Sequence, residues 1–285
     1  MTQRLKSARR ATCASQLRQC GLAAVRAGGS AGWRQCGLAA LAHVESHGGF
    51  PHSGGAPRTG RNAWGWAWQV LPFLEQLPLF NNPNDQFCQA QAVPTYFCPT
   101  RRPPVSIAGG YWAATSLPRG MLDYAGNGGS DMHWTWSAPA VSPGNGLFVQ
   151  HSVAYPLTPA HVRDGLSSTL LFGEKCMNRS FCTTDQQPDD NEGYTVPWED
   201  DNTRWATSNA FTGLRADITG PKYTFSTILP HNRAFGSSHA GVVQFVFCDG
   251  SVQSLSLDVS DETLRPALQP EGWRGGVAMR ALFRA

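Results

Sequence analysis

The chain has 285 residues, 41% of them hydrophobic, which is enough to bury a substantial core. Its 30 glycines and 20 prolines imply many turns and exclude a predominantly helical bundle. The formal net charge is +3, no stretch approaches the roughly 18 consecutive apolar residues of a membrane span, and the first 30 residues lack the apolar core of a secretion signal. These features predict a soluble domain of short strands and long loops.

Basic residues gather at the amino-terminus, where positions 1–61 hold nine lysines and arginines and one acid, Glu45. Such a segment can contact nucleic acid or an anionic membrane surface. The arginines are spread out, however, and no helix-turn-helix, zinc-finger or RNA-binding signature accompanies them. We therefore expect a solvated helix face and no nucleic-acid partner.

A helical region is predicted over 1–50. Residues 5–26 have the weakly apolar pattern of a surface helix, and the heptapeptide RQCGLAA occurs twice, at 18–24 and 34–40, around a Gly-rich segment that would break a helix. The second copy runs into a helix whose end is marked by Gly48, Gly49 and Pro51. Residues 51–285 are expected to form a single α+β domain.

After a loop over 52–62, the chain carries three closely spaced tryptophans, Trp64, Trp66 and Trp68. Trp64 and Trp68 with Leu71 and Phe73 suit a short amphipathic helix, whereas the three tryptophans would share one face of a strand. If these tryptophans are exposed, they would form a platform that stacks on a glycan. Large aromatic side chains more often lie in the hydrophobic core, and we favour that interpretation.

Short buried strands are predicted over 93–99, 121–129, 144–150 and 168–175. A hairpin is predicted later, with the apolar run 242–248 as its first strand and Asp249-Gly250 as a two-residue type I′ turn. His239 would then lie roughly 30 Å from Asp249, which excludes a shared proton and makes His239 a strand-entry or hydrogen-bonding residue. Ser260 is the N-cap of a short helix limited by prolines.

The eight cysteines contain no Cys-x-x-Cys spacing, which argues against a zinc site or a redox motif. Cys88 with Cys98, and Cys176 with Cys182, are close enough in sequence to form disulfides if the protein is exported. The alternative, that several cysteines are small buried apolar residues, carries equal weight.

Carboxylates gather between 185 and 201, with no basic residue before Arg204. Calcium binds six to eight oxygen ligands of this kind, although the spacing is not that of an EF-hand. The alternative is a solvated acidic loop in which Arg204 bridges to one carboxylate. The candidate calcium ligands are Asp189, Asp190, Asn191, Asp200 and Asp201.

Glu174 ends an apolar strand, so its carboxylate must be paired, hydrogen-bonded or exposed at a sheet edge. A glycosidase would need it within about 5 to 10 Å of a second carboxylate, such as Asp164 or Asp249. The chain lacks a Gly-x-Ser-x-Gly elbow, a phosphate-binding loop, a dinucleotide fingerprint and a His-Glu-x-x-His motif. A noncatalytic protein is therefore the preferred prediction.

The order and spacing of several short motifs resemble the large planctomycete family of unknown function number 1559, prepilin-type proteins with an H-x9-DG carboxyl-terminal signature. His239, Asp249 and Gly250 fall on that signature, and Glu174 lies in another family motif. The resemblance covers nearly the whole chain through RRATCASQLRQCGLAA, GGFP, LPFLEQ, YFCPTRR, DYAGNGG, NGLF, VRDGLSSTLLFGEK, DDNEG with DDNTRW, and FGSSHAGVVQFVFCDGSV.

The resemblance implies a pilin-like α+β fold, with an N-terminal helix packed on an antiparallel β-sheet and long loops. It also implies a pseudopilin-like envelope or surface protein in an envelope assembly. The ten tryptophans and the acidic segment add the expectation that its loops bind a cation or a glycan. A carbohydrate-active hydrolase using Glu174 and a loop aspartate, and a soluble solute-binding protein, are the alternatives. Family members open with a leader and a hydrophobic helix, whereas this chain starts in the polar part that follows. An envelope or extracellular location is expected, or a cytoplasmic one if the leaderless start is real.

Overall fold

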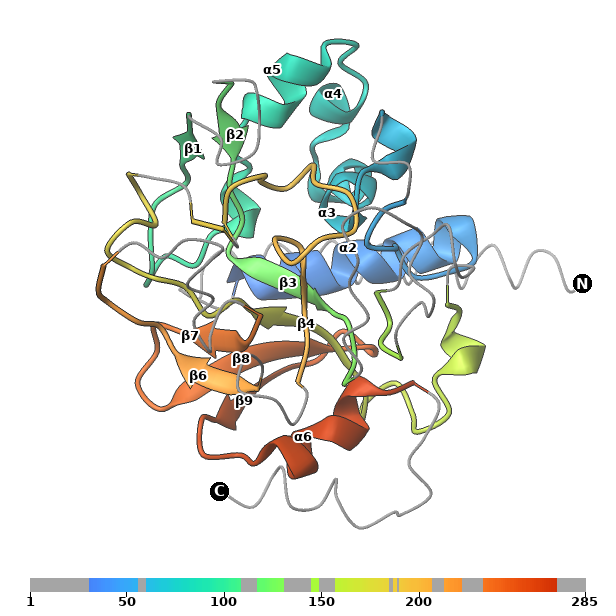
Figure 1. Cartoon of the computed structure of the whole chain (residues 1–285). Coiled ribbons are helices and arrows are strands. Elements are labelled where there is room, and N and C mark those ends of the chain that lie inside the picture. Colours follow the sequence, from blue (N-terminus) through green and yellow to red (C-terminus); the bar gives the residue numbers. More distant parts are fainter. Residues whose placement is uncertain are drawn as a thin grey trace, which may run out of the picture.

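The computed structural model describes residues 31–55, 60–108, 117–130, 145–148, 157–184, 187–188, 190–206, 213–221 and 233–270. The helix predicted over 5–26, the first RQCGLAA copy and Asp189 lie outside these residues. The described part has a mixed α+β fold around a five-stranded sheet, whose strands in spatial order are β5 (Thr203–Arg204), β3 (Tyr124–Asn127), β4 (Leu170–Glu174), β8 (Val242–Phe247) and β9 (Val252–Ser256) (Figure 1).

The central sheet is mixed, not purely antiparallel. Three of its strand pairs are antiparallel, but β5 runs parallel to β3, which corrects the antiparallel sheet implied by the family resemblance. Two small sheets accompany it, an antiparallel β1-β2 pair and a parallel β6-β7 pair. The strands are β1 (Ser106–Ile107), β2 (Arg119–Gly120), β3 (Tyr124–Asn127), β4 (Leu170–Glu174), β5 (Thr203–Arg204), β6 (Leu214–Ala216), β7 (Phe235–Ser237), β8 (Val242–Phe247) and β9 (Val252–Ser256).

The helix predicted from the second heptapeptide copy is confirmed as α2 (Ala31–His47), which is followed by Gly48 with a backbone φ of 80°. No helix in the described residues is both long and apolar enough to cross a bilayer. The α-helices are α2 (Ala31–His47), α3 (Trp66–Gln69), α4 (Leu77–Phe80), α5 (Asp85–Ala90) and α6 (Asp261–Leu268), and the 3-10 helices are η1 (Arg61–Ala63), η2 (Leu71–Leu74), η3 (Pro94–Tyr96) and η4 (Pro159–His161).

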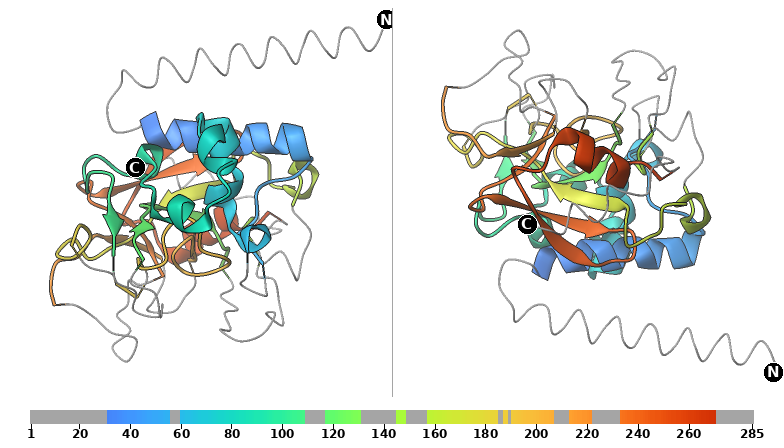
Figure 2. Two further views of the ribbon diagram at one scale, coloured as in Figure 1. Left: turned by 90° about the horizontal axis from the view of Figure 1, so that it is seen from above. Right: turned by 90° about the horizontal axis from the view of Figure 1, so that it is seen from below.

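Helices α2 and α6 lie on opposite faces of the sheet (Figure 2). A hydrophobic cluster packs under each of them. Strand β8 supplies both, because Val246 belongs to the α2 cluster while Phe245 and Phe247 belong to the α6 cluster. The apolar run over 242–248 is therefore a central strand buried on both faces, as predicted.

Strand β4 contains a bulge. Leu170 pairs with Phe247 and Phe172 pairs with Val246, so Leu171 is an extra residue in the ladder. After the bulge, the position of Gly173 faces Phe235 and Phe245. The next residue, Glu174, therefore points to the α2 side of the sheet.

The tryptophans are core residues, as we favoured. Trp64, Trp66 and Trp68 are at most 5% exposed, and the helical alternative is correct because α3 contains two of them. The Trp66 indole N–H donates to Asn202 O at 2.8 Å, which fixes a distant loop against this helix. Their burial removes the glycan-stacking platform.

Two strand predictions are wrong. Residues 93–99 contain the 3-10 helix η3, because Pro94 removes a ladder donor and suits the first turn of a helix. The described part of 144–150, residues 145–148, forms bends whose Leu147 and Phe148 N–H groups both donate to Asn127 O. The strands predicted over 121–129 and 168–175 are confirmed as β3 and β4.

The hairpin β8-β9 is confirmed, but its turn differs from the prediction. The Phe247 N–H donates to Ser251 O across a three-residue loop, and the Gly250 N–H donates to Phe247 O. Of the two turn residues only Gly250 has positive φ, at 82°. This is the pattern of a type I turn followed by a left-handed glycine, and the two-residue type I′ turn is therefore corrected.

Candidate functional site

The segment Cys98–Arg102 forms a tight turn beside the central sheet. The N–H groups of Arg101 and Arg102 both donate to Cys98 O, at 2.9 and 3.1 Å. The Cys98 N–H in turn donates to Asp123 Oδ2 at 2.8 Å, just before β3. These bonds fix the Cys98 side chain relative to the sheet.

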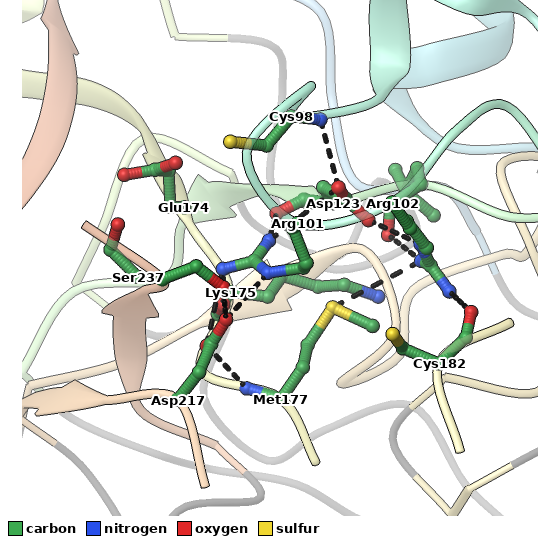
Figure 3. Close-up of polar contacts among 12 residues, drawn as sticks. Cys98, Arg101, Arg102, Asp123, Glu174, Lys175, Met177, Cys182, Asp217 and Ser237 are labelled. Atoms are coloured by element: carbon green, nitrogen blue, oxygen red, sulfur yellow. Dashed lines mark hydrogen bonds and ion pairs between the residues drawn. The ribbon is translucent and has the colours of Figure 1, made fainter. Parts of the chain in front are cut away.

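Both arginines of this turn are buried in an ion-pair cluster (Figure 3). Arg101 binds Asp217 through two nitrogens at 2.8 and 3.2 Å. Arg102 binds Asp123 and Asp190, each at 2.7 Å. Lys175 Nζ completes the cluster at 3.0 Å from Asp190.

Three cations and three carboxylates therefore balance one another in this cluster. Burial alone would raise the pKa of Asp190, but Arg102 and Lys175 outweigh it and lower that pKa to about 2. Removing a single member would leave an uncompensated buried charge, which typically costs about 3–5 kcal/mol.

Beside this cluster, three side chains from separate segments converge: Cys98, Glu174 at the end of β4, and His239 between β7 and β8. His239 Nε2 lies 3.3 Å from Glu174 Oε1 and 3.7 Å from Cys98 Sγ. Cys98 and Glu174 are buried, whereas the His239 side chain is 19% exposed. Figure 3 shows the sulfur of Cys98 on the side of the Glu174 carboxylate.

The geometry of this Cys98–Glu174–His239 cluster differs from that of a nucleophile triad. In a triad, one imidazole nitrogen faces the nucleophile and the other faces the carboxylate. Here Nε2 faces both groups. Burial and the Glu174 carboxylate also raise the pKa of Cys98 to about 11, so the thiol stays protonated at neutral pH.

His239 and Asp249 lie at opposite ends of β8, as the predicted strand implied. The partner of His239 is Glu174. The sequence predicted that the Glu174 carboxylate would be paired, hydrogen-bonded or exposed at a sheet edge. Glu174 Oε2 accepts from the Gln244 N–H at 3.0 Å. The side-chain hydrogen bond to Glu174 raises the pKa of His239.

Glu174 is not brought near the carboxylates considered for a glycosidase. The Asp249 N–H donates to Leu166 O, and its neighbour Cys248 donates to Thr169 O, at the start of β4. Glu174 ends that strand, roughly 16 Å away at about 3.3 Å per residue. Asp164 precedes Leu166 and lies at the same far end.

The acidic segment is irregular as predicted, but it is buried and not solvated. Asp190, Asn191, Asp200 and Asp201 are at most 4% exposed. The prediction of a solvated acidic loop, which was the alternative to a calcium site, is therefore wrong for these residues.

The candidate calcium ligands in this segment have protein partners. Asp190 binds Arg102 and Lys175, and Asp200 Oδ2 lies 3.0 Å from Arg233 Nε. Asp201 Oδ2 accepts from the Asn191 and Glu192 N–H groups. Calcium binding in this segment stays a prediction. Among the described residues, three ligand atoms of Cys, His, Asp or Glu lie within 4.8 Å of one another only in the group Cys98, Glu174 and His239.

The cysteines of the described residues are buried thiols, and the proposed disulfides are not formed. Cys88 donates to Leu79 O, and Cys98 faces His239. Cys176 and Cys182 donate to different carbonyls, Ala216 O and Arg179 O. The alternative of small buried residues is therefore correct for these four.

The sequence did not identify the roles of Cys98, Arg101 and Arg102, although their motif was part of the family resemblance. The usable signal was a pair of adjacent arginines two residues after the apolar segment 93–98, because arginines at such a position are buried only when they are paired. Their partners lie 21 to 116 residues away in sequence, so no local pattern reveals them.

The fold and the clusters define a mixed α+β domain stabilised by buried ion pairs, with one convergent Cys–Glu–His group among its described residues. Residues 26–262 match the family described as "Protein of unknown function (DUF1559)", also named SBP_bac_10, and the chain belongs to that family. No curated protein and no solved structure shows significant similarity to the chain.

Proposed function

We propose that the protein is a noncatalytic, pseudopilin-like component of the cell envelope or cell surface. The observation that carries this proposal is the packing of α2 along one face of the central sheet. Gly37 in the middle of α2 allows close contact with the hairpin β8-β9, since its neighbours there are Val246 and Gly250. A helix packed on a sheet is the arrangement that the family resemblance implies for pilin-like proteins.

The site geometry supports a binding role in preference to a catalytic one. Burial raises the pKa of the Cys98 thiol, which weakens it as a nucleophile, and the Glu174 carboxylate contacts His239 and the Gln244 N–H. A hydrolase using Glu174 would need a second carboxylate within about 10 Å of it. The two aspartates considered for that role lie at the opposite end of β4.

The loops of this proposed envelope protein suit a cation better than a glycan. The tryptophans that would stack on a sugar are buried in the core. Oxygen, nitrogen and sulfur ligands instead converge at Cys98, Glu174 and His239.

The test is to recover the native protein from separated cytoplasmic, envelope and extracellular fractions and to determine its intact mass and amino-terminal sequence. We expect the protein in the envelope or extracellular fraction. Recovery of an unprocessed chain starting at Met1 from the cytoplasm would overturn the envelope proposal. Assaying the same purified protein against glycoside substrates, with Glu174→Gln as the control, tests the noncatalytic part: turnover that is lost in the variant would contradict it.

A further inference from the structure

We propose that Cys98, Glu174 and His239 are the ligands of a divalent transition-metal ion, and that the ion is zinc. This inference is independent of the envelope role, because it depends only on the three side chains and their surroundings. It also reverses the expectation from cysteine spacing, which argued against zinc.

The distances between the ligand atoms fit tetrahedral zinc. Zinc binds sulfur at about 2.3 Å, nitrogen at about 2.0–2.1 Å and carboxylate oxygen at about 2.0–2.2 Å, so tetrahedral angles place sulfur and nitrogen ~3.6 Å apart and nitrogen and oxygen ~3.4 Å apart. The corresponding distances are 3.7 Å from Cys98 Sγ to His239 Nε2, and 3.3 Å from His239 Nε2 to Glu174 Oε1. The three ligand atoms lie within 4.8 Å of one another.

The hydrogen-bonding capacity of His239 also favours a metal. One imidazole nitrogen carries either a proton or a lone pair, so Nε2 cannot donate to Glu174 and accept from the Cys98 thiol at the same time. A metal ion bound by the Nε2 lone pair would engage both neighbours, because thiolate and carboxylate are themselves ligands. Glu174 Oε1 is fully buried and has no hydrogen-bond donor apart from this ion-pair contact with His239.

The charge balance of the surroundings leaves room for a cation. Three buried cations already match three carboxylates in the neighbouring ion-pair cluster. Glu174 is an additional fully buried carboxylate beside that cluster. A divalent ion would neutralise Glu174 and a Cys98 thiolate together.

Backbone groups hold two of the ligands in position. The Cys98 N–H is anchored on Asp123 Oδ2 at 2.8 Å, which fixes the backbone that carries the thiol. The Gln244 N–H holds the second oxygen of Glu174. Such outer contacts orient metal ligands and sustain affinity.

The ligand set selects the kind of ion. Calcium and magnesium prefer oxygen ligands only, whereas one thiolate, one imidazole and one carboxylate suit zinc. The partly exposed His239 leaves access for a fourth ligand, water, from the surface. The ion would join the Cys98 turn, the end of β4 and the segment before β8, and would thereby stabilise the fold.

The experiment measures zinc binding to the metal-stripped full-length protein by calorimetry and by competition with a chromophoric chelator. We expect one zinc ion per chain. Cys98→Ser, Glu174→Gln and His239→Gln should each weaken zinc binding by more than about 100-fold, because changes in outer contacts alone cost about 10- to 100-fold. Cys182→Ser and His47→Gln are the matched controls and should bind zinc as the parent does.

Cobalt in place of zinc gives a second measurement, which does not depend on how well the variants fold. The parent's cobalt complex should show a thiolate-to-metal charge-transfer band and the intense visible bands of tetrahedral cobalt. The proposal is overturned if the parent takes up no zinc, if zinc binding survives in all three ligand variants, or if the cobalt complex lacks the thiolate band. Calcium added in place of zinc should not compete.

Discussion

Gly37 of α2 lies so close to Val246 of β8 that a Cβ atom added at Gly37 would stand 2.6 Å from Val246 Cγ1. Real Cβ atoms do not approach other atoms so closely, so any side chain at this position must displace either the Val246 side chain or the helix. The glycine of the second RQCGLAA copy is therefore a packing residue for α2.

We expect Gly37→Ala to destabilise the protein by roughly 1 kcal/mol. Overpacking costs about 1–3 kcal/mol, and the better helix propensity of alanine returns at most about 1 kcal/mol. Chemical denaturation of Gly37→Ala, Val246→Ala and the double variant measures the coupling. Val246→Ala removes the obstructing methyl, so the double variant should be more stable than the two separate losses predict. Additive losses would contradict the contact.

The turn glycine Gly250 should tolerate alanine less well than Gly241. Both have positive φ, at 82° and 71°, which costs an alanine about 1–2 kcal/mol. A Cβ at Gly250 would also meet Leu41 Cδ1 of α2 at 2.9 Å, whereas nothing lies within 4 Å at Gly241. Comparing the unfolding free energies of Gly250→Ala and Gly241→Ala tests this difference. Equal losses would show that the hairpin does not press on α2.

Asp190→Asn should remove a pH-dependent part of the stability. The folded-state pKa of Asp190 is lowered to about 2, against about 3.9 in the unfolded chain. Its contribution, roughly 2–3 kcal/mol, is therefore present above about pH 4 and is lost as the pH falls through about 2.

Urea unfolding at a series of pH values measures that contribution. The free-energy difference between the parent and Asp190→Asn should be constant above about pH 4 and should shrink towards pH 2. Asp85→Asn, which removes a half-exposed ion pair with Arg61, is the control. It should change the free energy of unfolding by at most about 1 kcal/mol at any pH. A difference that persists undiminished at pH 2 would refute the assignment.

Arg102→Lys should lower the free energy of unfolding by about 3–5 kcal/mol, as much as the loss of a buried charge partner does. The guanidinium binds Asp123 through Nε, and binds Asp190 and Cys182 O through Nη1. A single ammonium group cannot reproduce this fork. The exposed Arg34 provides the control, since Arg34→Lys should leave the melting temperature unchanged. Similar melting temperatures for both variants would contradict the role of Arg102.

Features that depend on neighbouring residues were predictable from the sequence. Helix α2 and the hairpin followed from apolar spacing and from terminal glycines, and the prediction failed for the hairpin only in the number of turn residues. The apolar run 93–99 was misassigned because burial is shared by strands and by irregular core segments, and Pro94 was given too little weight.

The candidate site was not predictable in this way, because its parts are distant in the chain. Cys98, Glu174 and His239 are brought together by the pairing of β3, β4 and β8. The acidic segment was misread for the same reason. No basic residue lies near Asp190 in sequence, and its partners Arg102 and Lys175 come from other segments.

The bulge in β4 determines which way the end of that strand faces. If Leu171 paired in a regular ladder, the alternation of side chains would reverse for every later position of the strand, and Glu174 would pair opposite Val243. Its carboxylate would then enter the apolar core under α6. A change that made this ladder regular without shortening β4 would therefore separate Glu174 from His239, although no residue of the Cys98–Glu174–His239 cluster had changed. The bulge at Leu171 is as much a part of that cluster as its three side chains.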